Sequence, residues 1–299
     1  MKKLLLLICI SFTSQIAFSQ TAKDILKQKA EKQLQDIVNF SPFLSGVMAV
    51  DLTTGDSFAI NQDIVFAQAS AIKIPILMEV YKQAREGKFA LSDTRPLTAS
   101  NTVGGSGILN VMMDPVSLSI RNYCTLMIGL SDNSATNTLI ELVGLNNINA
   151  TMESLGLKNT RVQRKMIDQP ASLRNEENIS TPAEAVKIMK LLYDGKFIDK
   201  ASSDEILLIL QKNPIDNSKL ARGLPQNTGT KIAFKPGGMG GVSTEWGIIY
   251  MAKRPYAVAV MENYKAGPAP QDLIANISKT LYDYYSRMAR ATRYGVILD

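Results

Sequence analysis

The chain has no histidine at any of its 299 positions. This absence excludes the Ser-His-Asp and Cys-His catalytic arrangements, in which an imidazole carries the proton, and it excludes every histidine-ligated metal site. Proton transfer in this protein must therefore use lysine, aspartate, glutamate, tyrosine or water. We expect no bound metal and no other cofactor.

Cysteine is almost absent, with two residues in the whole chain. Cys9 lies within residues 1–19, which begin with two lysines after the initial methionine, continue with an apolar run and end in a small-x-small pattern. This order is typical of a secretory signal peptide, and the apolar run is too short to span a bilayer. The mature chain would retain only Cys124, so no internal disulfide can form. We predict a secreted, periplasmic protein without a stable membrane anchor.

Charge of one sign is not concentrated anywhere in the chain. The 33 lysines and arginines are scattered among 27 aspartates and glutamates, which gives a formal net charge of +6. No basic run with interleaved aromatic residues occurs, so nucleic-acid binding is not expected. With 45% hydrophobic and 20% charged residues, the composition is that of a folded globular protein with a substantial core.

The order of the expected elements predicts the fold class. A helical pattern near the N-terminus is followed by a hairpin, a long helical stretch, two further strands and a closing helix. These elements occupy, in order, residues 22–38, 46–61, 70 to about 212, 246–261 and 270 to about 289. The prediction is an α+β fold, in which an antiparallel sheet is flanked by the N- and C-terminal helices and an all-helical domain is inserted.

This order divides the mature chain into two units. Residues 20–69 and 213–299 would form a discontinuous α/β domain, and residues 70–212 would form the all-helical domain. A cleft between two such units is the expected place for a site. Within the helical unit, the sequence from Thr181 to Glu184 predicts a capping box with proline at the first helical position.

Ser70-Ala71-Ile72-Lys73 is the only Ser-x-x-Lys sequence in the chain. Residues three apart on a helix share a face, so the hydroxyl and the amine can meet. Pro75 indicates that the helix begins within a few residues of Ser70, because proline has no N–H to give to a later turn. Ser70 would then lie among free backbone N–H groups, which suit an oxyanion. The alternative is a serine that caps a helix beside a surface lysine.

Two further motifs follow along the chain. Ser131-Asp132-Asn133 precedes a helical run over residues 135–143, and taken alone it is explained by N-capping. Lys235-Pro236-Gly237-Gly238 lies near a C-terminal strand, and taken alone it is a glycine-rich strand end or turn.

Together and in this order, the three motifs resemble the signature set of class A β-lactamases and penicillin-binding proteins. The resemblance extends from about residue 22 to the C-terminal helix. It implies the β-lactamase/transpeptidase-like fold and a serine hydrolase of the cell envelope. The absent histidine and the signal sequence agree with it independently.

The resemblance implies catalytic roles for three residues. Ser70 would be the acylated nucleophile, Lys73 a candidate base for its proton, and Ser131 a relay that passes a proton to the leaving nitrogen. A lysine can act as a base near neutral pH only when its pKa is lowered, here by partial burial and by Lys235 as a second cation.

The resemblance also implies roles in substrate binding. Asn133 would hydrogen-bond the amide side chain of the substrate, and Lys235 would attract an acidic group. Backbone N–H groups of Ser70 and Gly238 would form the oxyanion hole. The expected partner is a small-molecule β-lactam or a peptidoglycan-derived substrate, and the protein is expected to be a monomer.

The chain departs from the family in the loop that carries the base for deacylation. Class A enzymes have a glutamate there in an Arg-x-Glu pattern, whereas this chain reads Arg164-Lys165-Met166. Methionine cannot activate water. Asp168 is the candidate replacement, against the alternative of a solvated or loop-capping carboxylate, and Glu176 and Glu177 are weaker candidates.

Three more positions differ from the family pattern. Asn178 takes the place of the aspartate partner of Arg164, so a charge pair is expected to become at best a hydrogen bond. Pro236 removes a hydroxyl that would bind a substrate carboxylate. Trp246 falls where an arginine often helps, although a core strand residue is the simpler interpretation. Lys235 would then bind the acidic group alone.

These observations predict a serine β-lactamase-like hydrolase, in which a β-lactam amide acylates Ser70 and deacylation is slow or uses another group. One alternative is a penicillin-binding-protein-like D-Ala peptidase or esterase. The other is a noncatalytic envelope-binding module that keeps the fold and has lost the catalytic activity. Met166 favours this alternative, whereas the intact motifs argue against it.

Overall fold

The computed structural model describes residues 21–212, 217–226, 228–267, 272–292 and 294–298. The predicted signal peptide, with Cys9, lies outside these residues. Among the described helices, none is long and apolar enough to cross a membrane.

A five-stranded sheet forms the centre of the fold, in the order β2-β1-β9-β8-β7. Its strands are β1 (Leu44–Asp51), β2 (Ser57–Ile60), β7 (Lys231–Met239), β8 (Val242–Tyr250) and β9 (Tyr256–Asn263). All neighbours are antiparallel, and β1 and β2 form the predicted hairpin. β1 also pairs along its whole length with β9, so strands from the two ends of the chain are neighbours.

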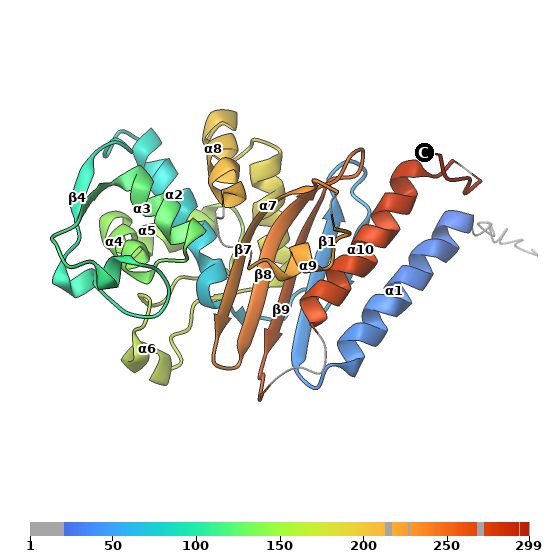
Figure 1. Cartoon of the computed structure of the whole chain (residues 1–299), viewed down its shortest axis with the longest axis horizontal. Coiled ribbons are helices and arrows are strands. Elements are labelled where there is room, and N and C mark those ends of the chain that lie inside the picture. Colours follow the sequence, from blue (N-terminus) through green and yellow to red (C-terminus); the bar gives the residue numbers. More distant parts are fainter. Residues whose placement is uncertain (1–20, 213–216, 227, 268–271, 293, 299) are drawn as a thin grey trace, which may run out of the picture.

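Two long helices cover one face of the sheet (Figure 1). α1 (Ala22–Phe40) and α10 (Leu273–Arg290) contact each other, and the short α9 (Lys219–Arg222) packs against α10. The apolar side predicted for the closing helix is buried in the structure and consists of Leu273, Ile277, Leu281 and Tyr284. The terminal helices therefore flank the sheet as predicted.

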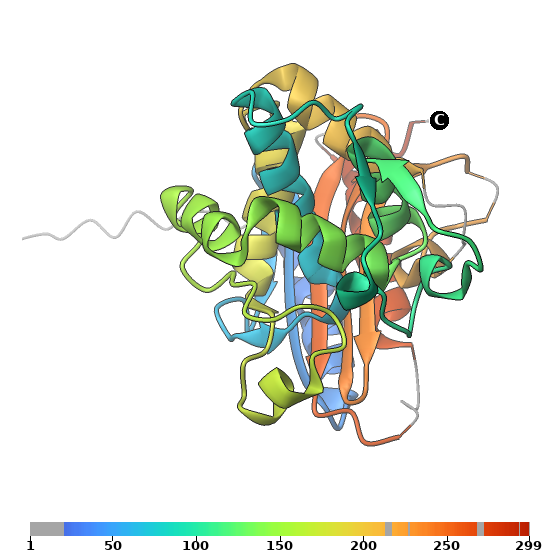
Figure 2. The ribbon, with the colours of Figure 1, turned by 90° about the vertical axis from the view of Figure 1, so that its left-hand side faces the viewer.

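The other helices form a block on the opposite face, which Figure 2 shows from the front. They are α2 (Lys73–Arg85), α3 (Ile120–Gly129), α4 (Asn133–Val143), α5 (Leu145–Ser154), α7 (Pro182–Tyr193) and α8 (Lys200–Gln211), with the short α6 (Gln169–Leu173) at its lower end. α7 contacts β1 and β9, and α8 contacts β7. Because the sheet is covered on both faces, β9 is buried without interruption from Tyr256 to Glu262.

The α+β class is confirmed, but the inserted block is not purely helical. Within it, β4 (Thr94–Pro96) pairs with β5 (Ser117–Ser119). β6 (Ile179–Ser180) pairs with β3 (Phe66–Ala67), which precedes the block. Pro96 cannot continue a helix, because it lacks the N–H that a helical turn requires. The boundaries of the two domains stay a prediction.

The predicted capping box at the start of α7 is only half formed. The Thr181 hydroxyl accepts from the backbone N–H of Glu184 at 3.2 Å, and Pro182 begins the helix as predicted. The Glu184 carboxylate does not return to Thr181. It accepts instead from the Asn159 backbone N–H at 3.0 Å and from the Thr160 hydroxyl at 2.7 Å. Glu184 therefore fixes a neighbouring loop rather than its own helix end.

Candidate active site

Ser70 lies in a 3₁₀ turn, η1 (Ala69–Ile72), that leads directly into α2. Pro75 is the third residue of α2, in the first turn, where its missing N–H has no helical partner. The prediction that the helix begins within a few residues of Ser70 is therefore confirmed. Within this turn the Ala71 N–H donates to the Gln68 carbonyl oxygen at 3.1 Å, and the Lys73 N–H donates to the carbonyl oxygens of Ser70 and Ala71.

The turn that carries Ser70 is anchored to the sheet through Gln68. Its carbonyl oxygen accepts from the Thr244 hydroxyl, and its side-chain oxygen accepts from the Trp246 indole N–H, both at 2.9 Å. Trp246 is fully buried, so it is the core strand residue that the simpler interpretation predicted. Its indole also positions the segment before Ser70, which the sequence did not indicate.

Lys73 is fully buried, and its ammonium group donates to three acceptors. These are the Ser131 carbonyl oxygen at 2.7 Å, the Ser131 hydroxyl at 3.1 Å and Oδ1 of Asn133 at 3.0 Å. An ammonium group has three N–H donors, so all of them are used. The first motif is thereby joined to the second.

Lys235 brings the third motif to the same place. It is buried on β7, and its Nζ donates to the Ser131 hydroxyl at 3.1 Å and to the Pro236 carbonyl oxygen at 3.0 Å. Ser131 has a φ of 54°, in the left-handed region that is uncommon for a serine. In this conformation its carbonyl and its hydroxyl oxygen both accept from Lys73.

N-capping explains Asp132 but not its neighbours. Its Oδ1 accepts from the Ala135 backbone N–H at 2.8 Å, as an N-cap does. Its Oδ2 accepts from the backbone N–H groups of Ile108 and Leu109 at 2.7 and 2.9 Å. The middle residue of the motif therefore fixes the loop on one side of the site, while the outer two face Lys73.

The Ser70 hydroxyl and the Lys73 amine, which the sequence indicates can meet, are not hydrogen-bonded to each other in the described part of the chain. Within the part of the chain that the structure describes, the Ser70 hydroxyl has no hydrogen-bond partner, whereas all three Lys73 donors are taken by Ser131 and Asn133. The two lysines thus converge on the Ser131 hydroxyl rather than on the Ser70 hydroxyl.

Burial changes the proton affinity of both lysines. Desolvation, reinforced by the Lys235 charge, lowers the pKa of Lys73 well below the 10.5 of a free lysine, and Asp132 acts in the opposite direction. Burial also lowers the pKa of Lys235 to about 7, against the effect of Glu245. The charged form of each amine lacks solvent, which is the main cause in both cases.

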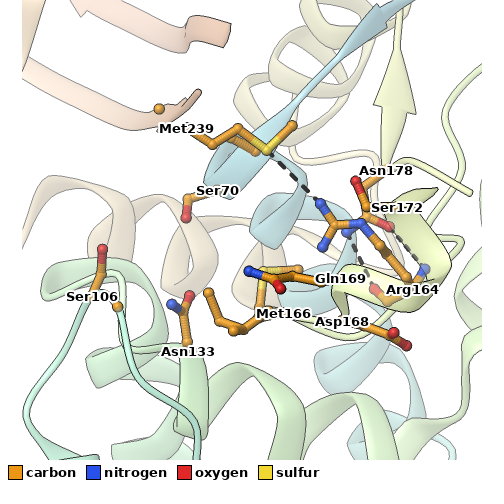
Figure 3. Close-up of a pocket in the computed structure, with 14 residues that line it drawn as sticks. Ser70, Ser106, Asn133, Arg164, Met166, Asp168, Gln169, Ser172, Asn178 and Met239 are labelled. Carbon is orange, nitrogen blue, oxygen red and sulfur yellow. Dashed lines mark hydrogen bonds between the residues drawn. The ribbon is translucent and has the colours of Figure 1, made fainter. Parts of the chain in front are cut away.

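A cavity of about 330 Å³ opens beside Ser70 (Figure 3). Among the predicted site residues, Ser70, Asn133, Asp168 and Gly238 line it. The walls come from η1, the loop around Gly105, the end of β7 and the loop from Arg164 to Asn178, and the further lining residues include Ser106, Met166, Ile167, Gln169, Ser172 and Met239. Lys73, Ser131 and Lys235 are not among the lining residues, and Lys73 is joined to the lining through its hydrogen bond to Asn133.

Gly237 allows β7 to approach the Ser70 turn closely. A Cβ atom at this position would lie 2.4 Å from the Gln68 carbonyl oxygen and 2.8 Å from the Ala71 nitrogen. At Gly238 a Cβ would meet nothing within 4 Å. The sequence prediction named Gly238 and missed Gly237, although the paired glycines were a visible signal.

Met166 is buried, and its main chain is held on both sides by Asn137. The Asn137 Oδ1 accepts from the Met166 N–H at 2.7 Å, and its Nδ2 donates to the Met166 carbonyl oxygen at 3.2 Å. Asn137 lies four residues after Asn133 on α4, so one helix face carries both. The sequence prediction missed Asn137, and this spacing was the available signal.

Asp168 caps the short helix α6. Its Oδ1 accepts from the Ala171 backbone N–H at 3.1 Å, which is the loop-capping alternative considered for this residue. Asp168 also lines the cavity, but Figure 3 shows its carboxyl group directed away from Ser70. Among the described residues, no group of three or more cysteines, aspartates and glutamates could hold a metal ion.

Arg164 has a charged partner, contrary to the expectation from Asn178. The guanidinium donates to the Glu177 carboxylate through Nε at 3.2 Å and Nη2 at 2.7 Å. Asn178 instead binds the main chain, with Oδ1 accepting from the Gln163 and Arg164 N–H groups at 2.7 and 3.1 Å. The ion pair of Arg164 therefore involves Glu177, which is one residue before the position where the family has its aspartate.

Comparison with known proteins identifies a family whose model matches the chain and several proteins of similar sequence. The model of the Beta-lactamase enzyme family matches residues 29–285. β-Lactamase VEB-1 of Pseudomonas aeruginosa is 23% identical over 304 residues, which cover 95% of this chain and 98% of that protein. β-Lactamase AST-1 of Nocardia asteroides is 23% identical and covers 85% of this chain and 83% of its own length.

Solved structures show the same similarity. A β-lactamase from Sphaerobacter thermophilus superposes with a TM-score of 0.78 at 29% identity, over 86% of this chain and 96% of the other. PBP-A superposes with a TM-score of 0.78 at 26% identity, over 85% and 95%. A mutant of PBP-A, solved as an acyl-enzyme complex with penicillin G, gives 0.77 at 27% identity, over 86% and 96%.

Proposed function

The chain belongs to the Beta-lactamase enzyme family, and from this premise we propose that it is a serine hydrolase whose Ser70 is acylated by the amide of a β-lactam. The observation that carries the proposal is the convergence of Lys73 and Lys235 on the Ser131 hydroxyl beside the Ser70 cavity. Two buried amines at one oxygen supply a base and a cation without any imidazole.

In the proposed acylation, Oγ of Ser70 forms a bond to the β-lactam carbonyl carbon and the ring C–N bond breaks. The Ser70 proton passes to the neutral amine of Lys73. The leaving nitrogen receives a proton from the Ser131 hydroxyl, which Lys73 then restores through the hydrogen bond that already joins them at 3.1 Å. No proton is gained or lost overall, and each transfer uses a pair of groups in or beside the cavity.

Backbone N–H groups of Ser70 and Gly238 would stabilise the negative charge on the carbonyl oxygen. Ser70 lies in the first turn of η1, and Gly238 lies near the end of β7, an edge strand whose outward-facing N–H groups have no neighbouring strand. One such donor is typically worth about 3 kcal/mol in the transition state. The charged Lys235 would attract the acidic group of the substrate.

Deacylation is expected to be slow. Met166 cannot activate water, and the carboxyl group of Asp168 is engaged in capping α6. An acyl-enzyme formed on Ser70 would therefore persist. We further propose that the protein is exported to the periplasm and acts as a monomer on a β-lactam or a peptidoglycan-derived substrate.

Intact-mass measurement after incubation with benzylpenicillin tests this function. The wild-type protein should gain the mass of one penicillin and lose it slowly, and Ser70→Ala should gain none. A wild-type protein that never gains the adduct would reject the proposal and favour a noncatalytic envelope-binding module. A time course that follows both gain and loss of mass separates acylation from deacylation.

A second candidate is a penicillin-binding-protein-like D-Ala peptidase or esterase. It is favoured by Met166, which leaves the acyl-enzyme without a dedicated base, and by the similarity to PBP-A. Release of D-Ala from a peptide that ends in D-Ala-D-Ala would support this candidate. Fast turnover of benzylpenicillin would support the β-lactamase.

A further inference from the structure

Gln68 is a fully buried glutamine that lies two residues before Ser70, and the proposed acylation does not use it. A buried polar group needs a hydrogen-bond partner inside the protein, and both the main chain and the side chain of Gln68 have such partners. Its backbone N–H donates to the Asn178 carbonyl oxygen at 2.8 Å, and its carbonyl oxygen accepts from the Thr244 hydroxyl at 2.9 Å. The main chain of Gln68 is therefore held between the sheet and the loop that ends at Asn178.

The side-chain amide of Gln68 joins three strands. Its nitrogen donates to the carbonyl oxygen of Phe66 on β3 at 2.9 Å, and the sulfur of Met261 on β9 lies 3.1 Å from the same nitrogen. Its oxygen accepts from the indole N–H of Trp246 on β8 at 2.9 Å. Trp246 lies opposite Lys235 in the register of β8 and β7. The amide cannot rotate without losing hydrogen bonds at both of its ends.

A single residue, Ala69, separates Gln68 from Ser70. Its φ is 45°, in the left-handed region that is uncommon for an alanine. Such a conformation persists only where the surrounding structure holds the chain on both sides. On one side Ala71 and Ile72 are fully buried, and on the other side Gln68 is fixed by its hydrogen bonds. The direction of the Ser70 hydroxyl therefore depends on Gln68.

From these contacts we propose that Gln68 is a positioning residue for acylation: its amide, fixed by the Trp246 indole, holds Ser70 in the orientation from which it attacks the substrate carbonyl carbon. The proposal rests on the proposed function of Ser70. Gln68 is not among the residues that line the cavity, so it acts through Ser70 and does not touch the substrate. Its loss should slow bond formation without weakening binding, because a displacement of about 1 Å can cost about 100-fold in rate.

Gln68→Met tests this role, because methionine has a similar length but lacks the amide donor and acceptor. Intact-mass time courses over a range of benzylpenicillin concentrations give the limiting rate of adduct formation and the concentration that half-saturates it. In Gln68→Met the limiting rate should fall at least tenfold, and the half-saturating concentration should stay within threefold of the wild type. A limiting rate within twofold of the wild type would overturn the proposal, and so would an effect on the half-saturating concentration alone.

Gln83→Met is the matched control. Gln83 is also a buried glutamine, and it lies on α2, the helix that follows the Ser70 turn. Its Nε2 donates to the Glu79 carboxylate at 2.7 Å and to the Val143 carbonyl oxygen at 2.9 Å. The same substitution there should lower the midpoint of urea unfolding but leave the limiting rate within twofold of the wild type. An equal fall of the limiting rate in both variants would identify lost stability as the cause and overturn the role of Gln68.

Trp246→Phe tests the same hydrogen bond from its other end, and it does so even where Gln68→Met fails to fold. It removes the indole N–H, keeps an aromatic ring and should lower the limiting rate at least threefold. In the double variant the two effects should not multiply, because both substitutions remove one shared bond. Effects that multiply would show that the two residues act independently, and would overturn the link between the indole and Ser70.

Trp246 is the only tryptophan in the chain, so its fluorescence reports on its hydrogen bond to Gln68. The emission maximum should shift in Gln68→Met and not in Gln83→Met, and an unchanged maximum in Gln68→Met would contradict the bond. If the wild-type protein forms no adduct with benzylpenicillin, the proposed function of Ser70 fails and this role fails with it. If the wild type and Gln68→Met form the adduct equally fast, only the role of Gln68 fails.

Discussion

Lys73 and Lys235 donate to the same atom, the hydroxyl oxygen of Ser131, each at 3.1 Å. Both amines are buried, so each charged form loses solvation and is repelled by the other. Loss of the Lys73 proton removes this repulsion and the desolvation cost of the Lys73 charge, and the Lys235 charge promotes that loss.

The rate of acylation by benzylpenicillin should fall as the pH rises through about 7, the value to which burial lowers the pKa of Lys235. Below that pH, Lys235 is charged and attracts the substrate carboxylate, and above it this attraction is lost. The decline should approach about tenfold per pH unit. Rates of adduct formation between pH 5 and 9 measure it. The methyl ester of benzylpenicillin lacks the carboxylate and should not show this decline. Identical pH profiles for benzylpenicillin and its methyl ester would contradict the proposal that Lys235 attracts the carboxylate.

Replacement of Gly237 by alanine should destabilise the protein by about 1–3 kcal/mol, because the new methyl group overlaps the Gln68 carbonyl oxygen. The same overlap shifts the Ser70 turn, so adduct formation should slow at least tenfold. Urea unfolding of Gly237→Ala checks the first effect, with Gly238→Ala as the matched control for stability. That control should stay within about 0.5 kcal/mol, since its Cβ meets open space. Equal destabilisation of the two variants would be the contrary result.

A glutamate at position 166 should accelerate loss of the acyl adduct. The main chain there is held by Asn137, so the new carboxylate would enter the cavity from a fixed point. A positioned general base contributes about 100-fold or more, and Met166→Glu should approach this increase. Met166→Gln has the same length but no basic oxygen, and it should retain the slow loss of the wild type. Equal deacylation rates in the two variants would disprove a missing base as the cause.

Asn178→Ala should lower the free energy of unfolding by about 2 kcal/mol, because it leaves the Gln163 and Arg164 N–H groups without their acceptor in a partly buried place. Glu177→Gln removes the charge that pairs with Arg164 at a partly exposed position and should cost less. Urea titrations of both variants provide the comparison. A larger loss in Glu177→Gln would show that the ion pair, rather than the asparagine, holds this loop.

Much of the fold follows from patterns that the sequence displays directly. The apolar side of the closing helix, the hairpin of β1 and β2, and the start of the helix after Ser70 each depend on residues close together in the chain. The convergence of three motifs on Ser131 is a long-range relationship, and only the resemblance to a family made it predictable. Nothing in the spacing of Lys235 alone indicates that it reaches Ser131.

The sequence did not predict which side chains form hydrogen bonds and ion pairs with one another in the loops. Glu177 and Asn178 are adjacent, and which of them faces Arg164 depends on the path of the chain, with positive φ values at Ile167 and Asn175. Glu184 stood at the right distance for a capping box, but a loop 25 residues earlier in the chain offered it better donors. Tertiary packing decides which of two possible partners a loop side chain binds, and local sequence patterns carry no information about that packing.

The pairing of β1 with β9 has a consequence for how the protein is made. Val47 lies opposite Val260, so the first long strand stays without one neighbour until nearly the whole chain has been synthesised. The segment before Ser70 is also fastened to β8 through Gln68 and cannot settle earlier. A nascent chain, or one truncated before β9, would thus expose a bare strand edge and lack a formed catalytic turn, which makes folding a late and slow event.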